Sequence, residues 1–298
     1  MPHDGSIRGM GEDALIQSLL PLMPSNEALI TGPGDDCAVV TGTPETDLLL
    51  KTDCVVEGMH FLPGTAPELI GRKALARAVS DVAAMGGTPR HALVTLLIHA
   101  DRPVSQVEGI YRGMHALAEQ FGISLAGGES SGLPTDGLII NIALTGEAPH
   151  DKALLRSTAQ AGDLIAVTGV LGGSFPTRHH LTFTPRIKEG GMLTASGLVS
   201  AMMDLSDGLG TDLPRLAAAS GLGFTVHQHL LPVRPGFTAG QAVGDGEDYE
   251  LLLTFPARHR EKLLELAAGQ FPETPLTVIG EMTPGTSGSL PAGYRHFR

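Results

Sequence analysis

Aspartate and glutamate residues gather in six short segments, each at a glycine turn or at the end of an apolar run. Asp36 lies in GPGDDCAVV (Gly32–Val40), and Asp53 follows a run of three leucines. Hard cations such as Mg²⁺ take oxygen ligands, and a loop tip lets several carboxylates converge on one ion. Six such segments with few lysines and arginines among them predict a site where divalent ions hold a polyphosphate.

MMDLSDGLGTDL (Met202–Leu213) is the most specific of these segments. Asp204 and Asp207 bracket Ser206 at the end of an expected strand, directly before a glycine and a helix. Three oxygen-bearing side chains at the start of a helix, whose backbone N–H groups attract anions, are typical of a cradle for a cation and a phosphate. The ordinary alternative, Asp207 as a helix N-cap, explains one of the three residues.

The other acidic residues have ordinary alternatives that the sequence leaves open. The turn at Asp36 would also suit a solvated loop. A charge at Asp53 inside an apolar strand would be balanced by Lys51 or by an edge position instead of a metal. Asp81 shares a small, apolar helix face, and Arg77 four residues earlier would pair with it.

Two glycine turns complete the set. GGESSG (Gly127–Gly132) carries Glu129 beside two serines that would donate to phosphate, and GDGEDYELL (Gly244–Leu252) places Glu247 before a strand. Each turn alone is more often a plain loop. No HExxH, GxSxG or Walker lysine pattern occurs, and a lone histidine such as His60 is usually structural.

The composition fits a globular chain of two domains. The 298 residues are 42% hydrophobic and 17% charged, which excludes a disordered or coiled-coil protein. The net charge of −12 argues against sequence-independent binding of nucleic acid. The longest apolar run is too short to cross a membrane. No signal peptide is recognised, and two cysteines are too few for a disulfide scaffold, so a reducing, cytoplasmic setting is expected.

Short apolar runs interleave with helical patterns, which favours an α+β fold of two mixed α/β domains over a Rossmann sheet. The neighbouring runs within 37–56 and within 123–146 are close enough to pair antiparallel. A polar stretch after residue 147 predicts domains at 1–148 and 149–298. The expected strands are 37–40, 48–56, 92–98, 123–128, 138–146, 163–169, 201–206, 223–228, 249–255 and 276–281, and the expected helices are 68–85, 104–121, 191–200, 209–220 and 256–270.

These motifs, in this order and over nearly the whole chain, resemble the thiamine-monophosphate kinase family, within the superfamily of aminoimidazole ribonucleotide synthase and selenophosphate synthetase. The resemblance rests on GPGDDCAVV, KTDCVVEGMHF, KALARAVSDVAAMGGTP, LIINIALTG, DLSDGLGTDL and GEDYELL. It implies a kinase that transfers the γ-phosphoryl group of ATP to thiamine monophosphate with Mg²⁺. It also implies a homodimer whose N-terminal domains form a central barrel, with ATP in the cleft between the N- and C-terminal domains.

The resemblance also implies roles for single residues. Asp81 and Asp207 would act at the reacting phosphate, and His60, Glu247 and Tyr294 would face the thiamine substrate. Gly128, Glu129, Arg156 and Ser206 would contact ATP, where the fixed charge of Arg156 suits a phosphate. The Mg²⁺ ligands would be Asp36, Thr52, Asp53, Asp81, Glu129, Asp204 and Asp207.

The chain departs from the family pattern at four places. Glu129 stands where the family has Asp, Lys51 where it often has a hydroxyl residue, and Gly173 where it has Asp. A helical segment usually found before the PR motif is missing from Phe175–Arg186. The alternatives are therefore another ATP-dependent kinase or synthase of the superfamily, or a weakly active nucleotide-binding paralogue.

Overall fold

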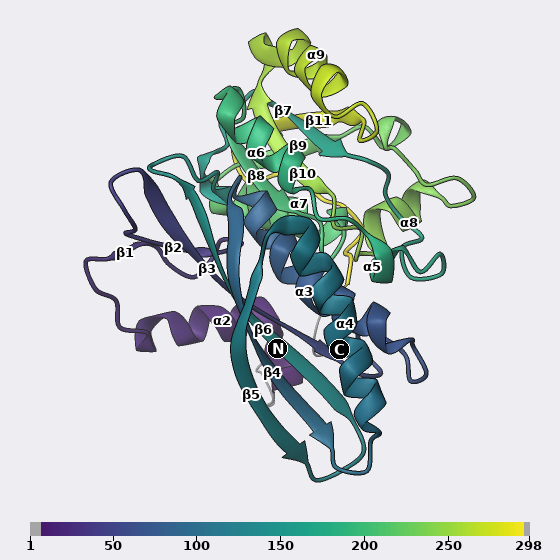
Figure 1. Cartoon of the computed structure of the whole chain (residues 1–298). Helices are drawn as coiled ribbons and strands as arrows, with labels where there is room; N and C mark the ends of the chain where they lie inside the picture. Colours follow the sequence, from purple (N-terminus) through teal and green to yellow (C-terminus); the bar gives the residue numbers. More distant parts are fainter. Residues whose placement is uncertain (1–6, 295–298) are drawn as a thin grey trace.

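The computed structural model describes residues 7–294; the ends of the predicted domains, 1–6 and 295–298, lie outside the described residues. The chain forms a six-stranded sheet in the order β1-β2-β3-β6-β4-β5 and a five-stranded sheet in the order β8-β10-β7-β11-β9 (Figure 1). The elements up to the second sheet are α1 (Ile7–Met10), α2 (Glu12–Leu19), β1 (Leu29–Thr31), β2 (Ala38–Val40), β3 (Thr46–Val56), α3 (Pro67–Ala84), β4 (Thr88–His99), α4 (Val104–Phe121), β5 (Ser124–Leu133) and β6 (Leu138–Pro149).

The remaining elements build the second half. They are β7 (Asp163–Thr168), α5 (His179–Thr182), α6 (Ile187–Ser196), β8 (Ala201–Asp204), α7 (Leu209–Ala219), β9 (Gly223–Val226), α8 (Ala239–Gly244), β10 (Leu251–Pro256), α9 (Arg260–Gln270) and β11 (Leu276–Thr283). The mixed α/β, two-sheet architecture expected from the interleaved pattern is confirmed.

Helices α3 and α4 cover one face of the first sheet. The middle of β4 alternates, with Ala92 and Val94 buried in the core and Leu93 50% exposed on the other face. The two helices approach each other closely through glycines: a Cβ on Gly113 would lie 1.9 Å from the carbonyl oxygen of Glu68. The sheet face opposite the helices keeps apolar side chains in solvent, Leu50 (39% exposed) and Leu93 among them.

The pairing expected within 123–146 is wrong. β5 and β6 follow each other in sequence, but β4 lies between them, and β5 runs parallel to β4. β6 instead pairs with β3 along its whole length, from Thr46 opposite Pro149 to Val56 opposite Ile139. The pair within 37–56 is antiparallel as expected, with Ala38 opposite Leu50.

The second sheet is covered on both faces. Leu209, Leu213 and Leu216 of α7 pack on one face, and Leu263 of α9 with Leu193 of α6 on the other. The helix expected at 191–200 instead begins at Ile187 and ends at Ser196, so its first turn was missed. Among the described residues, no helix combines the length and hydropathy that a membrane crossing needs.

Helix α3 lies between the two sheets (Figure 1). Most of its residues are buried, including the charged Lys73 and Asp81. Its last turn enters the core of the second half, where Ala84 packs with Leu193 and Leu198. Side chains on α3 can therefore reach both halves of the molecule.

Candidate active site

Three predicted metal ligands meet where the two halves touch. Asp36 precedes β2, Asp81 lies on α3 and Asp204 ends β8, and one ligand oxygen of each lies within 4.8 Å of the others. All three are buried, with 2%, 6% and 2% of their surfaces exposed in that order. Asp204 is fixed by Ser80, whose hydroxyl donates to Oδ2 over 2.6 Å. We call Asp36, Asp81 and Asp204 the acidic cluster.

The carboxylates of the acidic cluster are buried close together, so their ionised forms are disfavoured. Burial raises the pKa of Asp204 to about 7, and the charge of Asp36 adds to the effect, while the Ser80 hydroxyl opposes it. Burial also raises the pKa of Asp81 well above its usual range, against the charge of Lys51. Buried carboxylates of this kind become stable anions when cations neutralise them.

Basic side chains of the chain itself supply part of that neutralisation. Lys51 Nζ lies 2.9 Å from Asp81 Oδ1, and Arg77 Nη2 lies 3.1 Å from Asp53 Oδ1. The two alternative pairings considered from sequence, Lys51 with Asp53 and Arg77 with Asp81, are thus exchanged. Long side chains of β3 and α3 reach across the gap between the elements rather than along their own chain.

Arg156 neutralises a second member of the cluster. Its guanidinium pairs with Asp36 through Nη2, and its backbone N–H donates to Asp35 Oδ2 over 3.1 Å. Burial, together with the charge of Asp36, raises the pKa of Asp35 to about 6. The residue expected to contact ATP therefore lies beside the acidic cluster.

A cavity of about 240 Å³ is lined by both halves, and its wall includes Ser206 and Asp207, which follow Asp204 of the acidic cluster in the sequence. Four sequence-predicted residues line it together with His60, and the full lining is Met59, His60, Arg77, Phe175, Ser206, Asp207, Asp245, Gly246, Glu247, Tyr249 and Tyr294. Burial lowers the pKa of His60 to about 4, so the ring is neutral. Its Nδ1 accepts the Val56 N–H over 3.0 Å, which leaves the ring proton on Nε2.

Glu247 is held in the cavity wall by a buried lysine that sequence reasoning missed. Lys73 Nζ lies 2.7 Å from Glu247 Oε1 and 2.9 Å from His180 Nδ1, and it donates to the His60 carbonyl over 2.5 Å. Burial raises the pKa of Glu247, but the His180 hydrogen bond and the charge of Lys73 outweigh this effect and lower the pKa to about 2. Glu247 adopts a φ of 56°, a strained conformation that aims its side chain.

The helical spacing of α3 carried the signal for Lys73. Lys73, Arg77 and Asp81 are four residues apart, so they share one helix face, and Ser80 lies beside it. A lysine and an arginine on the same face as a buried aspartate predict a charged face turned toward another element.

Asp207 does not cap a helix. Gly208 is the N-cap of α7 and makes no side-chain cap, while Asp207 Oδ2 lies 2.5 Å from Arg215 Nη1. The Asp207 N–H donates to Asp212 Oδ2, and its carbonyl accepts the Tyr294 N–H over 2.9 Å. The carboxylate is therefore held by Arg215 and does not cap α7, and Asp207 is one of the residues that line the cavity.

Two predicted metal ligands lie away from the cluster within one protomer. Thr52 points to the open face of the first sheet, where its hydroxyl donates to Asn141 Oδ1 over 3.1 Å. Glu129 pairs in register with Thr95, a residue of the same open face, and its carboxylate accepts from Ser131 over 3.2 Å. Asp81 lies on α3, behind the other face of this sheet.

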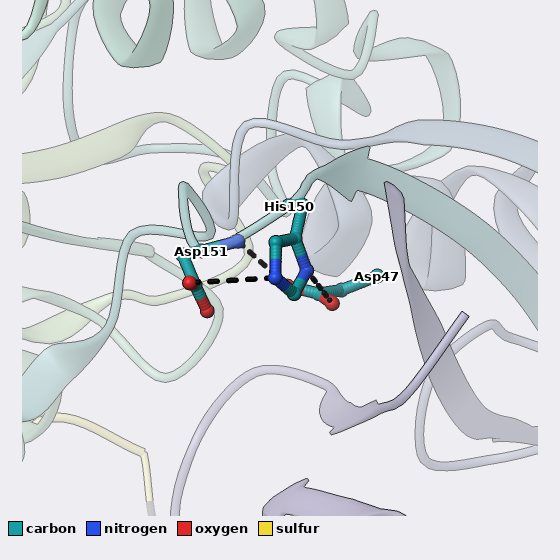
Figure 2. Close-up of side chains that lie close together, drawn as sticks. All are labelled: Asp47, His150 and Asp151. Carbon is teal, nitrogen blue, oxygen red and sulfur yellow. Dashed lines mark hydrogen bonds and ion pairs between the residues drawn. The ribbon is translucent and has the colours of Figure 1, made fainter. Parts of the chain in front are cut away.

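A second acidic group with a histidine lies at the start of the connection between the halves (Figure 2). His150 Nδ1 lies 2.8 Å from Asp47 Oδ1, and its Nε2 lies 3.4 Å from Asp151 Oδ2. The hydrogen bond to Asp47 and the charge of Asp151 raise the pKa of His150. Carboxylates on both ring nitrogens favour an imidazolium, so this group is an ion pair that ties the connection to β3.

Asp248, beside Glu247, is expected to make stability pH-dependent. The Gly172 N–H donates to Oδ2 over 2.8 Å, while Oδ1 has no hydrogen-bond partner among the described residues. Burial raises the pKa of Asp248 to about 7. The folded state thus binds this proton more tightly than the unfolded state, and the stability it contributes is lost as pH rises from about 4 through 7.

Asp248→Asn is therefore expected to lose less stability than the wild type between pH 5 and pH 8, by about 2 to 3 kcal/mol. Urea unfolding at both pH values measures the difference, with Asp101→Asn as an exposed control. Equal losses of stability between pH 5 and pH 8 in the wild type and in Asp248→Asn would contradict this expectation.

The two halves of the chain match two family models. Residues 34–148 match "AIR synthase related protein, N-terminal domain" and residues 155–292 match "AIR synthase related protein, C-terminal domain". The fold and the acidic cluster at the junction therefore define a member of the AIR synthase-related class of proteins.

The names of similar proteins identify a family within this class. A thiamine-monophosphate kinase of Salmonella typhimurium is 34% identical over 96% of this chain and 98% of its own, and one of Bacillus subtilis is 31% identical over 97% and 100%. The structure described as AaThiL complexed with AMPPCP and TMP superposes with a TM-score of 0.83 at 29% identity, covering 98% of both chains. The chain belongs to the thiamine-monophosphate kinase family.

The alignment with the Salmonella protein runs over 328 positions, more than the 298 residues of this chain, so it contains gaps in this chain.

Proposed function

We propose that this protein transfers the γ-phosphoryl group of ATP to thiamine monophosphate, giving thiamine diphosphate and ADP in the presence of Mg²⁺. The observation that carries the proposal is the acidic cluster, which three separate elements bring within 4.8 Å beside a cavity lined by both halves. The family supports the substrate pair, since its relatives are named thiamine-monophosphate kinases and one solved relative is complexed with AMPPCP and TMP.

The donor set of the cluster fits Mg²⁺, which binds carboxylate oxygens through few protein ligands. Asp36, Asp81 and Asp204 would hold it. Asp53, which pairs with Arg77, and Asp207, which lines the cavity, would be further ligands. When bound, the ion neutralises charge on the polyphosphate. Arg156 brings a permanent guanidinium to the same place, and Ser206 contributes a hydroxyl at the cavity wall.

The cavity suits the thiamine end of the substrate. Thiamine carries a permanent positive charge on its thiazolium ring, and Glu247, with a pKa lowered to about 2, stays negative at neutral pH. His60, whose ring is neutral, and Tyr294 line the same cavity. Phosphoryl transfer needs positioning and charge neutralisation more than proton transfer, so no general base is assigned.

The active assembly in this proposal is a homodimer. The N-terminal half (1–148) would bind ATP and metal and pair with its copy into a central barrel, and the C-terminal half (149–298) would complete the cleft. The exposed leucines Leu50 and Leu93 on the open sheet face support pairing there, because burial of apolar surface stabilises association. The free cysteines Cys37 and Cys54 support a reducing, cytoplasmic location.

Gly128 and Glu129 would act across the dimer interface. Because Glu129 and Thr52 lie on the open face, away from their own chain's Asp81, they can serve a metal only where two open faces meet. Glu129→Gln, which keeps length and removes charge, is expected to lower turnover about tenfold or more, and Glu129→Asp to retain activity.

Mixed dimers test the arrangement. A heterodimer of one Glu129→Gln chain and one Asp207→Asn chain would contain one intact site, made from Asp207 of the first chain and Glu129 of the second. Recovered turnover in that heterodimer, purified through two different tags, is the expected result. Activity no higher than in the two parent homodimers would mean that Glu129 serves the site of its own chain, and full activity of the Glu129→Gln homodimer would place Glu129 outside the site.

The function itself is tested by incubating the protein with ATP, Mg²⁺ and thiamine monophosphate and separating the products by chromatography. Equal amounts of ADP and thiamine diphosphate are expected, with neither formed in EDTA. ADP formation that another small molecule stimulates would favour a different kinase or synthase of the superfamily. ATP binding without any transfer would favour a nucleotide-binding paralogue.

A further inference from the structure

Lys51 places a positive charge inside the acidic cluster. It lies on β3, and its ammonium approaches Asp81 Oδ1 to 2.9 Å, with 22% of the lysine side chain and 9% of the aspartate side chain exposed. Asp81 is shared with Asp36 and Asp204, whose oxygens lie within 4.8 Å of it. Lys51 therefore occupies one side of the volume that three carboxylates enclose.

Arg156 and Lys51, the two basic residues at the cluster, differ in the shape of their charged groups. Arg156 binds Asp36 from the side of the second half through a planar guanidinium. Lys51 presents a compact point charge with three donors, which resembles a hydrated cation more closely than a guanidinium does. An ammonium 2.9 Å from Asp81 Oδ1 engages an oxygen that a Mg²⁺ would otherwise take as a ligand.

We propose that the Lys51 ammonium stands in for one divalent ion at the acidic cluster, so that this protein binds one ion fewer there than it would with a neutral residue at position 51. The inference rests on the proposed function, since it concerns the metals of that site. Like charges repel strongly at this separation in a buried site, so an ion next to Asp81 on the side of Lys51 is excluded while the lysine is present.

Counting bound Mn²⁺ by electron paramagnetic resonance tests the proposal without any turnover. Lys51→Ser is expected to bind one Mn²⁺ more per chain than the wild type, with and without AMPPCP. Lys51→Arg keeps the charge and is expected to match the wild type. Lys262→Ser removes an exposed lysine of α9 and serves as the matched control. Equal counts in Lys51→Ser and the wild type would overturn the proposal.

Thermal unfolding with Mg²⁺ alone gives a second readout. In EDTA, Lys51→Ser is expected to melt below the wild type, because three buried carboxylates lose a counter-charge. Mg²⁺ is expected to raise its Tm more than it raises the Tm of the wild type. A variant that folds with Mg²⁺ and not in EDTA supports the proposal, and one that fails to fold in both shows that a metal cannot replace the ammonium.

The outcomes separate the inference from the proposed function. Absence of phosphoryl transfer, with an extra ion in Lys51→Ser, would remove the kinase reaction and leave the role of Lys51. Full phosphoryl transfer with equal ion counts in Lys51→Ser and the wild type would keep the kinase reaction and overturn the proposed role of Lys51.

Discussion

Asp207→Asn is expected to lower turnover with ATP and thiamine monophosphate by about 10²-fold or more, with the fold intact. Asparagine keeps the shape of the side chain and can still accept from Arg215, which now lies 2.5 Å from the carboxylate. What it loses is the negative charge offered to a cation at the transferring phosphate. Steady-state kinetics and a urea unfolding curve of the same preparation measure the two properties.

Two controls accompany Asp207→Asn. Asp101→Asn changes a side chain that is 93% exposed, and its turnover should equal that of the wild type. Arg215→Met removes the ion pair and keeps the carboxylate, so a much smaller loss is expected. Turnover of Asp207→Asn within twofold of the wild type would show that the carboxylate serves only the ion pair with Arg215.

Lys73→Met is expected to lower the free energy of unfolding by about 3 kcal/mol or more. Lys73 is fully buried, and its removal leaves Glu247 and the His60 carbonyl without their shared donor. Burial lowers the pKa of Lys73 to about 8 against the charge of Glu247, so the ammonium is still present at neutral pH. Urea unfolding at pH 7 gives the measurement, and Lys262→Met is the exposed control.

A double variant tells whether the loss comes from the stranded carboxylate. Lys73→Met combined with Glu247→Gln should be more stable than Lys73→Met alone, because no buried charge is left unpaired. If the two changes simply add, Lys73 contributes through packing and not through Glu247.

Local pattern was sufficient for the long elements of the first half. The helix predicted at 104–121 is α4 to the residue, and the helix predicted at 68–85 is displaced by one residue from α3. Both carry an apolar stripe with helical period and end at glycines, so neighbouring residues determine them. The start of α6 was predicted four residues late, at Gly191, although Gly190 and Gly191 both lie inside the helix.

Gly190 is explained by a contact that no local pattern contains. A Cβ at this position would lie 2.1 Å from the Ala83 carbonyl oxygen, so the glycine lets α6 approach α3. The order of the first sheet failed for a similar reason, since the place of β4 between β5 and β6 depends on which apolar faces pack on α3 and α4.

In the site, too, some features follow from neighbouring residues, and others depend on residues far apart in the sequence. Residue type and turn position were enough to select Asp36, Asp81 and Asp204, which the fold brings together. The partners of the charges were not predictable, because Lys51 and Arg77 reach residues on another element. Because the two partners lie far apart in the sequence, their pairing cannot be predicted even when both residues are already candidates for the site.

Helix α3 makes the two halves one cooperative unit. Lys73 binds Glu247, Ser80 binds Asp204, and Ala84 completes the core around Leu193 and Leu198. A hinge between the halves would have to pull a buried ammonium and a buried hydroxyl from their acceptors, so the cleft keeps its width while substrates exchange. Calorimetry should accordingly show one transition for the whole chain, and the C-terminal half expressed without α3 should be less stable because the core around Leu193 and Leu198 loses Ala84.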